Sequence, residues 1–287
     1  MITEFAPAKV NLSLRVGALG EDGYHPVDSI VVFADWGDAL TVTPSDALSL
    51  EVSGPMSQAI PGGEDNLVLR AVRLLAQASG QDAKGNISLV KEIPAGAGLG
   101  GGSADAAAAL RAFNRLWELD WPLDMLAGLG SQIGSDIAAC VWSQPLRMTG
   151  RGERIRLIDD WPDFPALLVN PGVSVATGPV FAKFDEAPQT GAAFRPQGDL
   201  IGALQVATND LTAPACAIAP VIDDVLAALA ATKDPQLVRM SGSGATCFAI
   251  YPDEAARDAA AGAIRQVQPG WHVFPIVFRG VSAITPT

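Results

Sequence analysis

The residues of this sequence most able to do chemistry lie between positions 96 and 102, where five of seven residues are glycine. Ser103 and an alanine-rich stretch at 104–117 follow directly. The backbone N–H groups of consecutive glycines can converge on an anion, and the N-terminus of a helix that follows adds a partial positive charge. The pattern favours a phosphate cradle that needs no basic side chain. The alternative is a turn in which two backbone segments pack closely, where glycine is also used.

Two better-known phosphate motifs do not account for this loop. The spacing Gly96-x-Gly98-x-x-Gly101 matches the dinucleotide fingerprint, but residues 87–93 before it alternate apolar and polar and predict a strand with one wet face. The P-loop pattern fails because Gly102 stands where the phosphate-binding lysine would be. The loop is therefore of a third kind, and a nicotinamide dehydrogenase is the weakest of the possible functions.

Hydrophobic periodicity indicates the elements that must position this loop. It predicts strands at 10–16, 29–34, 39–42, 87–93, 166–170, 245–251 and 271–278. It predicts helices at 66–78 (capped by Asp65 or Asn66), 104–117, 123–129, from near Ser131 to 141, 178–184, 218–231 and 254–264. This mixture is typical of an α+β fold rather than a doubly wound sheet. A turn-rich segment suggests a boundary that divides the chain into domains 1–157 and 158–287, and the stretch 187–199 is expected to be a mobile loop.

Composition limits the classes of partner and the compartment. The chain has 287 residues, enough for two domains, and a net charge of -12. This acidity argues against a nucleic-acid-binding or membrane-binding surface, so an anionic ligand would need a local site. Three widely spaced cysteines and two histidines disfavour a disulfide scaffold and a zinc site. Because the sequence shows neither a signal peptide nor a transmembrane stretch, we expect a cytoplasmic protein.

Three segments together resemble the GHMP small-molecule kinases. Residues 94–105 resemble the central P-x-x-x-G-L-G-S/G-S motif of that superfamily, and residues 6–12 and 239–246 agree with its other two motifs in order and spacing. Residues 22–25 and 35–38 resemble the members that act on a cytidine diphosphate derivative of methylerythritol. The resemblance implies an N-terminal domain of the ribosomal S5 domain 2 type, a C-terminal ferredoxin-like domain and transfer of the γ-phosphoryl group of ATP to the 2-hydroxyl of that substrate.

Alternatives remain open at this point. Another GHMP kinase of the mevalonate or homoserine type would carry the same loop. A regulator that binds nucleotides without catalysis would share the scaffold, but the presence of both Lys9 and Asp136 disfavours it. We expect a small molecule as the partner, and a monomer or weak homodimer.

The resemblance assigns roles to individual residues. Lys9 and Asp136 are the candidate catalytic pair, in which the ammonium keeps the carboxylate ionised as a general base; a solvated lysine and a helix-capping aspartate are the alternatives. Ser103 is the candidate ligand of Mg²⁺, which usually binds few protein groups besides phosphates and water. The residues expected to bind ATP are Pro94, Ala95, Gly96, Ala97, Gly98, Leu99, Gly100, Gly101, Gly102, Ser103 and Ala104.

A second set of residues would bind the substrate or close the site. Tyr24 would stack on the cytosine base and His25 would hydrogen-bond its edge, unless both pack locally against the next strand. Asn11 would bind the polyol or the base, and Phe181 would be a second stacking ring or a core residue. The loop of Ser241, Gly242, Ser243 and Gly244 would close the phosphate region, unless it is a simple turn.

A few positions depart from the pattern of the superfamily or lack a motif. Pro26 follows His25 where a polar or acidic residue is usual, and Ala138 stands where a proline is usual, so the helix after Asp136 should continue more regularly. His272 has no motif around it and is expected to be structural.

Overall fold

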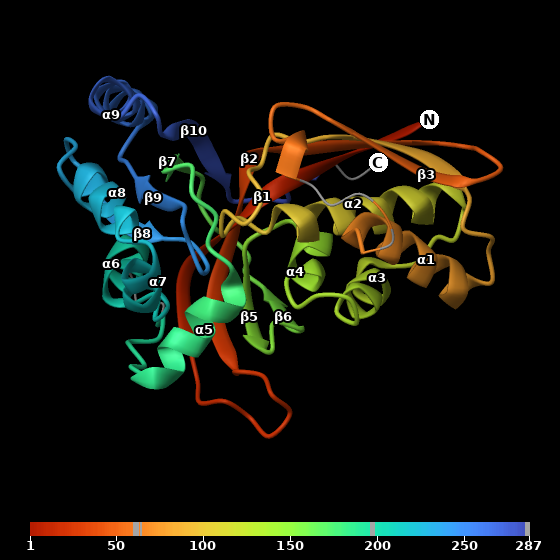
Figure 1. Ribbon diagram of the computed structural model, residues 1–287, viewed down its shortest axis with the longest axis horizontal. Helices are drawn as coiled ribbons and strands as arrows, with labels where there is room; N and C mark the ends of the chain where they lie inside the picture. The colour runs from red at the N-terminus through yellow and green to blue at the C-terminus, as the bar shows by residue number, and fades with distance from the viewer. Residues whose placement is uncertain (60–62, 64, 196–198, 285–287) are drawn as a thin grey trace.

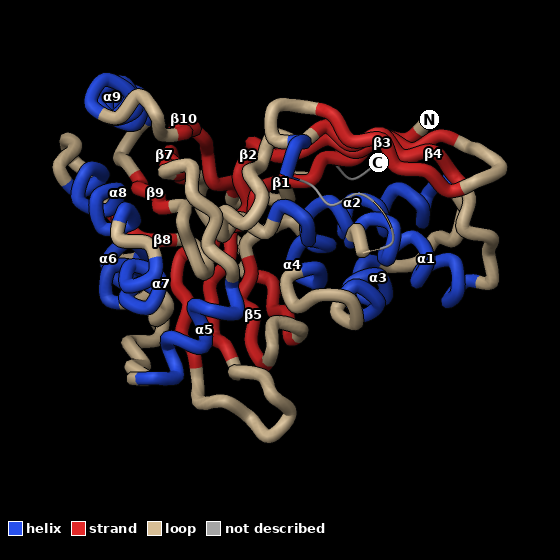
Figure 2. Tube along the Cα trace, in the orientation of Figure 1, coloured by secondary structure: helices blue, strands red, loops and turns tan. Residues whose placement is uncertain are grey.

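The computed structural model describes residues 1–59, 63, 65–195 and 199–284, and the strands in this part of the chain join into one sheet (Figures 1 and 2). Its main path runs β3-β4-β2-β10-β7-β9-β8, with β1 and β5 also paired to β2, and β6 paired to β5. The strands are β1 (Ile2–Val16), β2 (Val27–Thr43), β3 (Leu48–Ser53), β4 (Gly85–Val90), β5 (Leu146–Gly150), β6 (Arg154–Leu157), β7 (Phe164–Asn170), β8 (Leu237–Met240), β9 (Cys247–Ile250) and β10 (His272–Arg279).

Helices cover this sheet in two groups (Figure 2). Those of the N-terminal half are α1 (Leu67–Ser79), α2 (Gly101–Leu116), α3 (Leu123–Gly130) and α4 (Ile137–Trp142), after a short 3₁₀ turn at Ser57–Ala59. Those of the C-terminal half are α5 (Thr177–Glu186), α6 (Leu200–Val206), α7 (Thr212–Ile218), α8 (Val221–Ala230) and α9 (Glu254–Val267). The α+β expectation is confirmed.

Strand β1 differs from the half-buried strand that its alternating pattern predicts, because both of its faces are buried between residues 6 and 14. Val10 and Leu12 belong to an apolar core, whereas Lys9 and Asn11 on the opposite face are also buried, with 3% and 1% of their surface exposed. The glycine loop covers this polar face, and the backbone N–H of Lys9 donates to the carbonyl of Leu99 at 2.9 Å. The alternating pattern of β1 therefore marks one apolar face and one polar face that are both buried, and not a face exposed to solvent.

Helix α2 packs against β1, β2 and α1 through its alanines, whose small side chains allow a close approach. Asn66 is the N-cap of α1, and its side chain accepts a hydrogen bond from the N–H of Val68, as predicted. The helix expected from near Ser131 begins only at Ile137. The strands expected at 29–34 and 39–42 are one long strand, β2.

The C-terminal half has the β-α-β-β-α-β order of a ferredoxin-like domain, with its strands arranged β10-β7-β9-β8 and every neighbouring pair antiparallel. The helix expected at 218–231 is α8, which begins only at Val221, and the preceding helix α7 was not predicted. Helix α6 and strands β3, β5, β6 and β8 escaped the periodicity analysis because they are short.

The two halves are joined through the sheet rather than by a linker alone. Strand β10 pairs with β7 of its own half and, at Phe278 and Arg279, with β2 of the other. The segment after it returns to the N-terminal half, where the N–H of Ala283 donates to the carbonyl of Ser143 at 2.8 Å. The boundary at 157/158 falls between β6 and β7 and stays a prediction. The part of the 187–199 loop that is described, 187–195 and 199, has no helix or strand, and residues 196–198 lie outside the described residues.

Candidate active site

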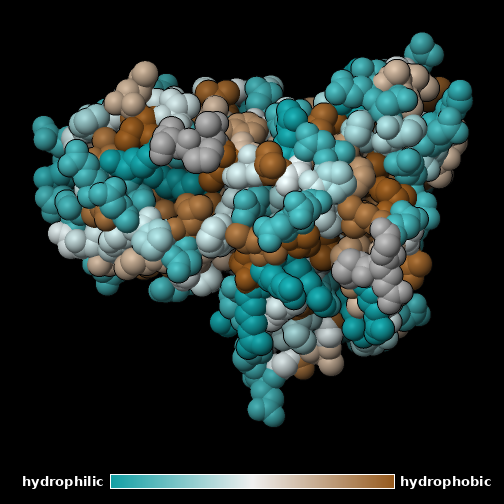
Figure 3. Space-filling view, turned by 180° about the vertical axis from the view of Figure 1, so that it is seen from behind, coloured by the Kyte–Doolittle hydropathy of each residue, from teal (hydrophilic) through white to brown (hydrophobic). Residues whose placement is uncertain are grey.

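A cavity of about 920 Å³ lies where the glycine loop, β1, the start of α4 and helix α5 meet. It is lined by most of the residues predicted from the sequence: Lys9, Asn11, Tyr24, His25, Pro94, Ala95, Gly96, Ala97, Gly98, Gly100, Gly101, Gly102, Ser103, Asp136, Phe181, Gly242 and Ser243. Leu99 and Ala104, predicted to bind ATP, are instead buried in apolar cores, each 1% exposed. The face of the molecule seen in Figure 3 carries both hydrophilic and hydrophobic residues.

Lys9 and Asp136 meet in the cavity although 127 residues separate them in sequence. The Nζ atom of Lys9 donates to Oδ2 of Asp136 at 3.0 Å and to Oδ1 of Asn11 at 2.9 Å. The side chain of Lys9 is 4% exposed and that of Asp136 is 33% exposed. Asp136 is the N-cap residue of α4, but its side chain makes no capping hydrogen bond. The carboxylate is thus directed to the lysine, which disfavours the helix-capping alternative.

Asn11 belongs to a chain of buried hydrogen bonds that fixes its amide. Its Nδ2 donates to Oγ of Ser29 at 2.7 Å, and that hydroxyl donates to the carbonyl of Ser13 at 2.5 Å. Because the orientation of the amide leaves Oδ1 facing the ammonium of Lys9, Asn11 holds that ammonium beside Asp136. The described contacts of Asn11 thus make it a partner of Lys9.

The glycine loop has a backbone that other residues adopt with difficulty. Gly96, Gly98 and Gly100 have φ values of 64°, 74° and 64°, in the left-handed region. A Cβ atom on Gly98 would lie 2.5 Å from the carbonyl oxygen of Ser241 and 2.7 Å from that of Gly244. Ser241 Oγ donates to the carbonyl of Gly98 at 2.9 Å and accepts from the N–H of Asn11 at 3.2 Å. The loop at 241–244 therefore packs directly on the glycine loop, through its backbone carbonyls and the hydroxyl of Ser241.

A buried ionic cluster beneath the loop was not anticipated. Lys91 was expected on a wet face, but it is 1% exposed and its Nζ donates to Asp38 Oδ2 and, at 2.6 Å, to Asp105 Oδ2. The other oxygen of Asp38 accepts from the backbone N–H groups of Glu92 and Ile93 at 2.6 and 2.9 Å. The cluster thereby joins β2, the segment before the glycine loop and the first turns of α2.

Within this cluster one carboxyl group bears the larger cost of burial. The pKa of Asp105 is raised to about 8, mainly by burial in the protein interior; Lys91 opposes this shift and the negative charge of Asp38 adds to it. Asp105 Oδ1 has no hydrogen-bond partner among the described residues, whereas Asp38 is stabilised by two backbone donors. Two carboxyl groups therefore share one ammonium, and Asp105 is the one that retains a proton more readily.

Aromatic side chains from the β1–β2 loop and from α5 line another part of the cavity. The ring of His25 lies 5.1 Å from that of Phe181, its Nδ1 is 2.9 Å from the carbonyl oxygen of Gly17, and its Nε2 is 3.4 Å from Asp185 Oδ1. Tyr24 is 52% exposed. The guanidinium of Arg151, which the sequence did not single out, lies 5.0 Å from the centre of the tyrosine ring and also lines the cavity.

The remaining sequence candidates have structural surroundings. His272 stacks on Phe274 with the ring centres 6.2 Å apart, and it is absent from the residues that line the cavity. The carbonyl of Pro26 accepts from the N–H of Gly17 at 2.7 Å, which closes the base of the β1–β2 loop. Ala138 is buried within α4. The three cysteines are buried and free, and burial raises the pKa of the Cys140 thiol to about 12, so this thiol stays protonated.

Donors for a metal ion are sparse. Among the described residues there is no group of three or more His, Cys, Asp or Glu side chains that could hold one, while Ser103 and Asp136 both line the cavity. A hydroxyl and a carboxylate fit Mg²⁺ that enters with a nucleotide and keeps phosphates and water as most of its ligands. None of the helices in the described ranges is long and apolar enough to cross a membrane.

Comparisons with known proteins identify the family of this chain. The family model "GHMP kinases N terminal domain" matches residues 66–144, and "GHMP kinases C terminal" matches residues 192–270. The 4-diphosphocytidyl-2-C-methyl-D-erythritol kinase of Paramagnetospirillum magneticum is 47% identical over 94% of this chain and 96% of its own length. The enzyme of the same name from Parvibaculum lavamentivorans is 42% identical, again over 94% and 96%.

Solved structures give the same answer. A crystal structure of 4-(cytidine 5'-diphospho)-2C-methyl-D-erythritol kinase superposes with a TM-score of 0.79 at 30% identity, over 97% of this chain and all of the other. A homoserine kinase from Cytophaga hutchinsonii shares the fold, with a TM-score of 0.73, at only 16% identity over 99% of this chain and 96% of the other. The chain therefore belongs to the 4-diphosphocytidyl-2-C-methyl-D-erythritol kinases, a family within the GHMP kinases.

Proposed function

We propose that this protein transfers the γ-phosphoryl group of ATP to the 2-hydroxyl of 4-(cytidine 5'-diphospho)-2-C-methyl-D-erythritol, a step of non-mevalonate isoprenoid biosynthesis. The observation that carries the proposal is the pairing of Lys9 with Asp136 at 3.0 Å in a cavity that is lined by both the glycine loop and the His25–Phe181 pair. Membership of the kinase family supports the reaction, and this arrangement supports the assignment of roles.

Asp136 would act as the base. Its carboxylate accepts the proton of the substrate hydroxyl while the substrate oxygen bonds to the γ-phosphorus and the bond to the bridging oxygen of ADP breaks. Because phosphoryl transfer passes through a loose transition state, orientation of the hydroxyl and stabilisation of charge matter more than early proton removal. Lys9, held by Asn11, would stabilise negative charge on the transferring group and keep Asp136 oriented.

The glycine loop would hold the phosphates of ATP through its N–H groups and the N-terminus of α2. The backbone contact between Gly98 and residues 241–244 supports a role of that loop in closing the phosphate region. Mg²⁺ would be held by the phosphates and the Ser103 hydroxyl, and it would neutralise phosphate charge. Asn66 and Leu67, at the start of α1, line the cavity on the far side of Gly102 and would contact the nucleoside of ATP.

The cytidine diphosphate would occupy the end of the cavity lined by aromatic residues. A cytosine ring between Tyr24 and Phe181 would gain stacking energy, and His25 would meet the edge of the base. Arg151 lies over Tyr24 and has no ion pair with a described residue, which suits it to the diphosphate of the substrate.

A substrate panel tests the proposal. Purified protein is incubated with Mg·ATP and, separately, with the cytidyl substrate, mevalonate and homoserine, and the release of ADP is followed. We expect ADP with the cytidyl substrate alone. Release with mevalonate or homoserine only would reject the substrate, and no release with any of the three would favour a regulator that binds nucleotides.

A further inference from the structure

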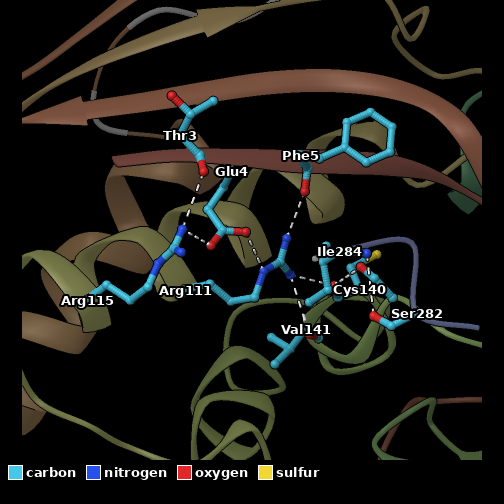
Figure 4. Close-up of polar contacts among 10 residues, drawn as sticks. Thr3, Glu4, Phe5, Arg111, Arg115, Cys140, Val141, Ser282 and Ile284 are labelled. Atoms are coloured by element: carbon cyan, nitrogen blue, oxygen red, sulfur yellow. Dashed lines mark hydrogen bonds and ion pairs between the residues drawn. The ribbon is translucent and has the colours of Figure 1, made fainter. Parts of the chain in front are cut away.

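Arg111 lies in the middle of α2 and its guanidinium bonds to two other elements (Figure 4). Its Nε donates to Glu4 Oε2 at 2.9 Å and its Nη2 donates to the carbonyl of Phe5 at 2.8 Å, both on β1. Its Nη1 donates to the carbonyls of Cys140 and Val141, at 2.9 and 3.3 Å, in α4. Arg111 is only 5% exposed. One planar side chain therefore ties α2, β1 and α4 together in the interior.

These three elements are the ones that carry the proposed catalytic groups. Helix α2 begins at the glycine loop, and β1 carries Lys9 four residues after Phe5. Asp136 is the N-cap of α4, and its carbonyl accepts the N–H of Cys140 at 3.1 Å. The carbonyl of the same Cys140 accepts from Arg111, so one helical turn separates the guanidinium from the backbone of the proposed base.

Helix α4 needs an external anchor because it has only six residues, 137–142, too few to hold its own orientation. Arg111 also places a positive charge at its C-terminal carbonyls, where the helix dipole favours a cation. Glu4 balances that charge, and its second carboxylate oxygen binds Arg115 one turn further along α2. The 3.0 Å contact between Lys9 and Asp136 joins β1 to α4 at one place, and Arg111 joins the same two elements at another.

We infer that Arg111 is a positioning residue, which holds α4 and β1 at the separation that brings Asp136 and Lys9 together. The inference rests on the proposed roles of those two residues. A lysine at position 111 could pair with Glu4, but its compact ammonium lacks the planar fork that reaches β1 and α4 at once. Because a displacement of about 1 Å in a reacting group can lower a rate about 100-fold, the loss should appear in turnover rather than in binding.

The test uses four variants of the purified full chain: Arg111→Lys, Arg115→Lys, Asp136→Asn and the double variant Arg111→Lys/Asp136→Asn. For each variant, kcat, the KM values for ATP and the cytidyl substrate, and the melting temperature are measured. We expect Arg111→Lys to lower kcat about 10- to 100-fold with both KM values within about twofold. In the Asp136→Asn background the same substitution should have no further effect on kcat, a result that a purely structural role would not produce.

Arg115→Lys is the comparison variant because Arg115 also binds Glu4, and its described hydrogen bonds run to Glu4 and Thr3 on β1. Its kcat should stay within about twofold of the unsubstituted protein. If Arg111→Lys does not fold, Glu4→Gln takes its place, because it leaves one oxygen for two arginines and should give a smaller loss confined to kcat.

Two outcomes overturn the inference. One is an unchanged kcat in Arg111→Lys, or in Glu4→Gln where that variant is used. The other is an equal loss of kcat with and without Asp136→Asn. Full turnover in Asp136→Asn alone would instead reject the proposed role of Asp136, and the inference would fall with it.

Discussion

Replacement of Gly98 by alanine tests whether contact between the two glycine-rich loops shapes the proposed ATP site. Two effects oppose a side chain there. The φ of 74° lies in the left-handed region, which costs a residue with a Cβ about 1–2 kcal/mol. The Cβ would also lie 2.5 and 2.7 Å from the carbonyl oxygens of Ser241 and Gly244, and such crowding costs about 1–3 kcal/mol more.

Gly80 provides a control that separates these two effects. It ends α1 with a φ of 72°, but a Cβ there would meet nothing within 4 Å. Gly80→Ala should therefore lower the free energy of unfolding by about 1–2 kcal/mol and leave the KM for ATP unchanged. Gly98→Ala should lower it by about 2–5 kcal/mol, or displace the loops and raise the KM for ATP at least about tenfold, since tenfold in binding corresponds to about 1.4 kcal/mol.

The measurements are urea unfolding and steady-state kinetics at saturating cytidyl substrate. If Gly98→Ala behaves like Gly80→Ala in both, the packing of residues 241–244 on the glycine loop does not determine the ATP site, and the reasoning is refuted.

Three further predictions concern the cluster, the second loop and the aromatic end of the cavity. Lys91→Met should lower the free energy of unfolding by about 3–5 kcal/mol because it leaves two buried carboxyl groups without their cation. Asp105→Asn should lower it much less, because burial already raises the pKa of that carboxyl to about 8. Equal decreases for the two variants in urea unfolding would contradict this prediction. Ser241→Ala removes the hydroxyl that binds the N–H of Asn11 and the carbonyl of Gly98, and should lower the free energy of unfolding by about 1–3 kcal/mol. A decrease near zero in urea unfolding would show that these hydrogen bonds do not contribute to stability. Phe181→Ala should raise the KM for the cytidyl substrate about two- to tenfold, as the loss of an aromatic contact of about 0.5–1.5 kcal/mol implies, with the KM for ATP unchanged as the internal control.

The proposed catalytic pair and the proposed phosphate loop were singled out from local motifs, because glycine spacing and the polar residues around them are visible in the sequence. Their proximity was implied only by the resemblance, because Lys9 and Asp136 are 127 residues apart and their contact depends on how β1, α2 and α4 pack. The ferredoxin-like order was implied by the resemblance, and the pairing of β10 with β2 across the two halves became visible only in the fold.

Burial of charge was the main feature that the sequence could not supply. Lys91 lies in an alternating strand pattern that is typical of exposed lysines, and its partner Asp38 precedes it by 53 residues. Arg111 sits in an alanine-rich helix where nothing nearby in the sequence marks it as an anchor. Both depend on contacts between distant segments, and an unaccompanied sequence offers no signal for such contacts. The usual expectation that charged residues are exposed to solvent fails at these positions, because each charge is neutralised by a partner that the fold provides.

The central claim is that Asp136 and Lys9 perform phosphoryl transfer to the cytidyl substrate. It is tested most directly by ³¹P NMR of the reaction with Mg·ATP, in which the unsubstituted protein is compared with an Asp136→Asn variant that has the same melting temperature. The account predicts one ADP and one new phosphomonoester on the 2-hydroxyl per substrate consumed, formed at least about 100-fold more slowly by the variant. Formation of the same product by Asp136→Asn at an undiminished rate would contradict it.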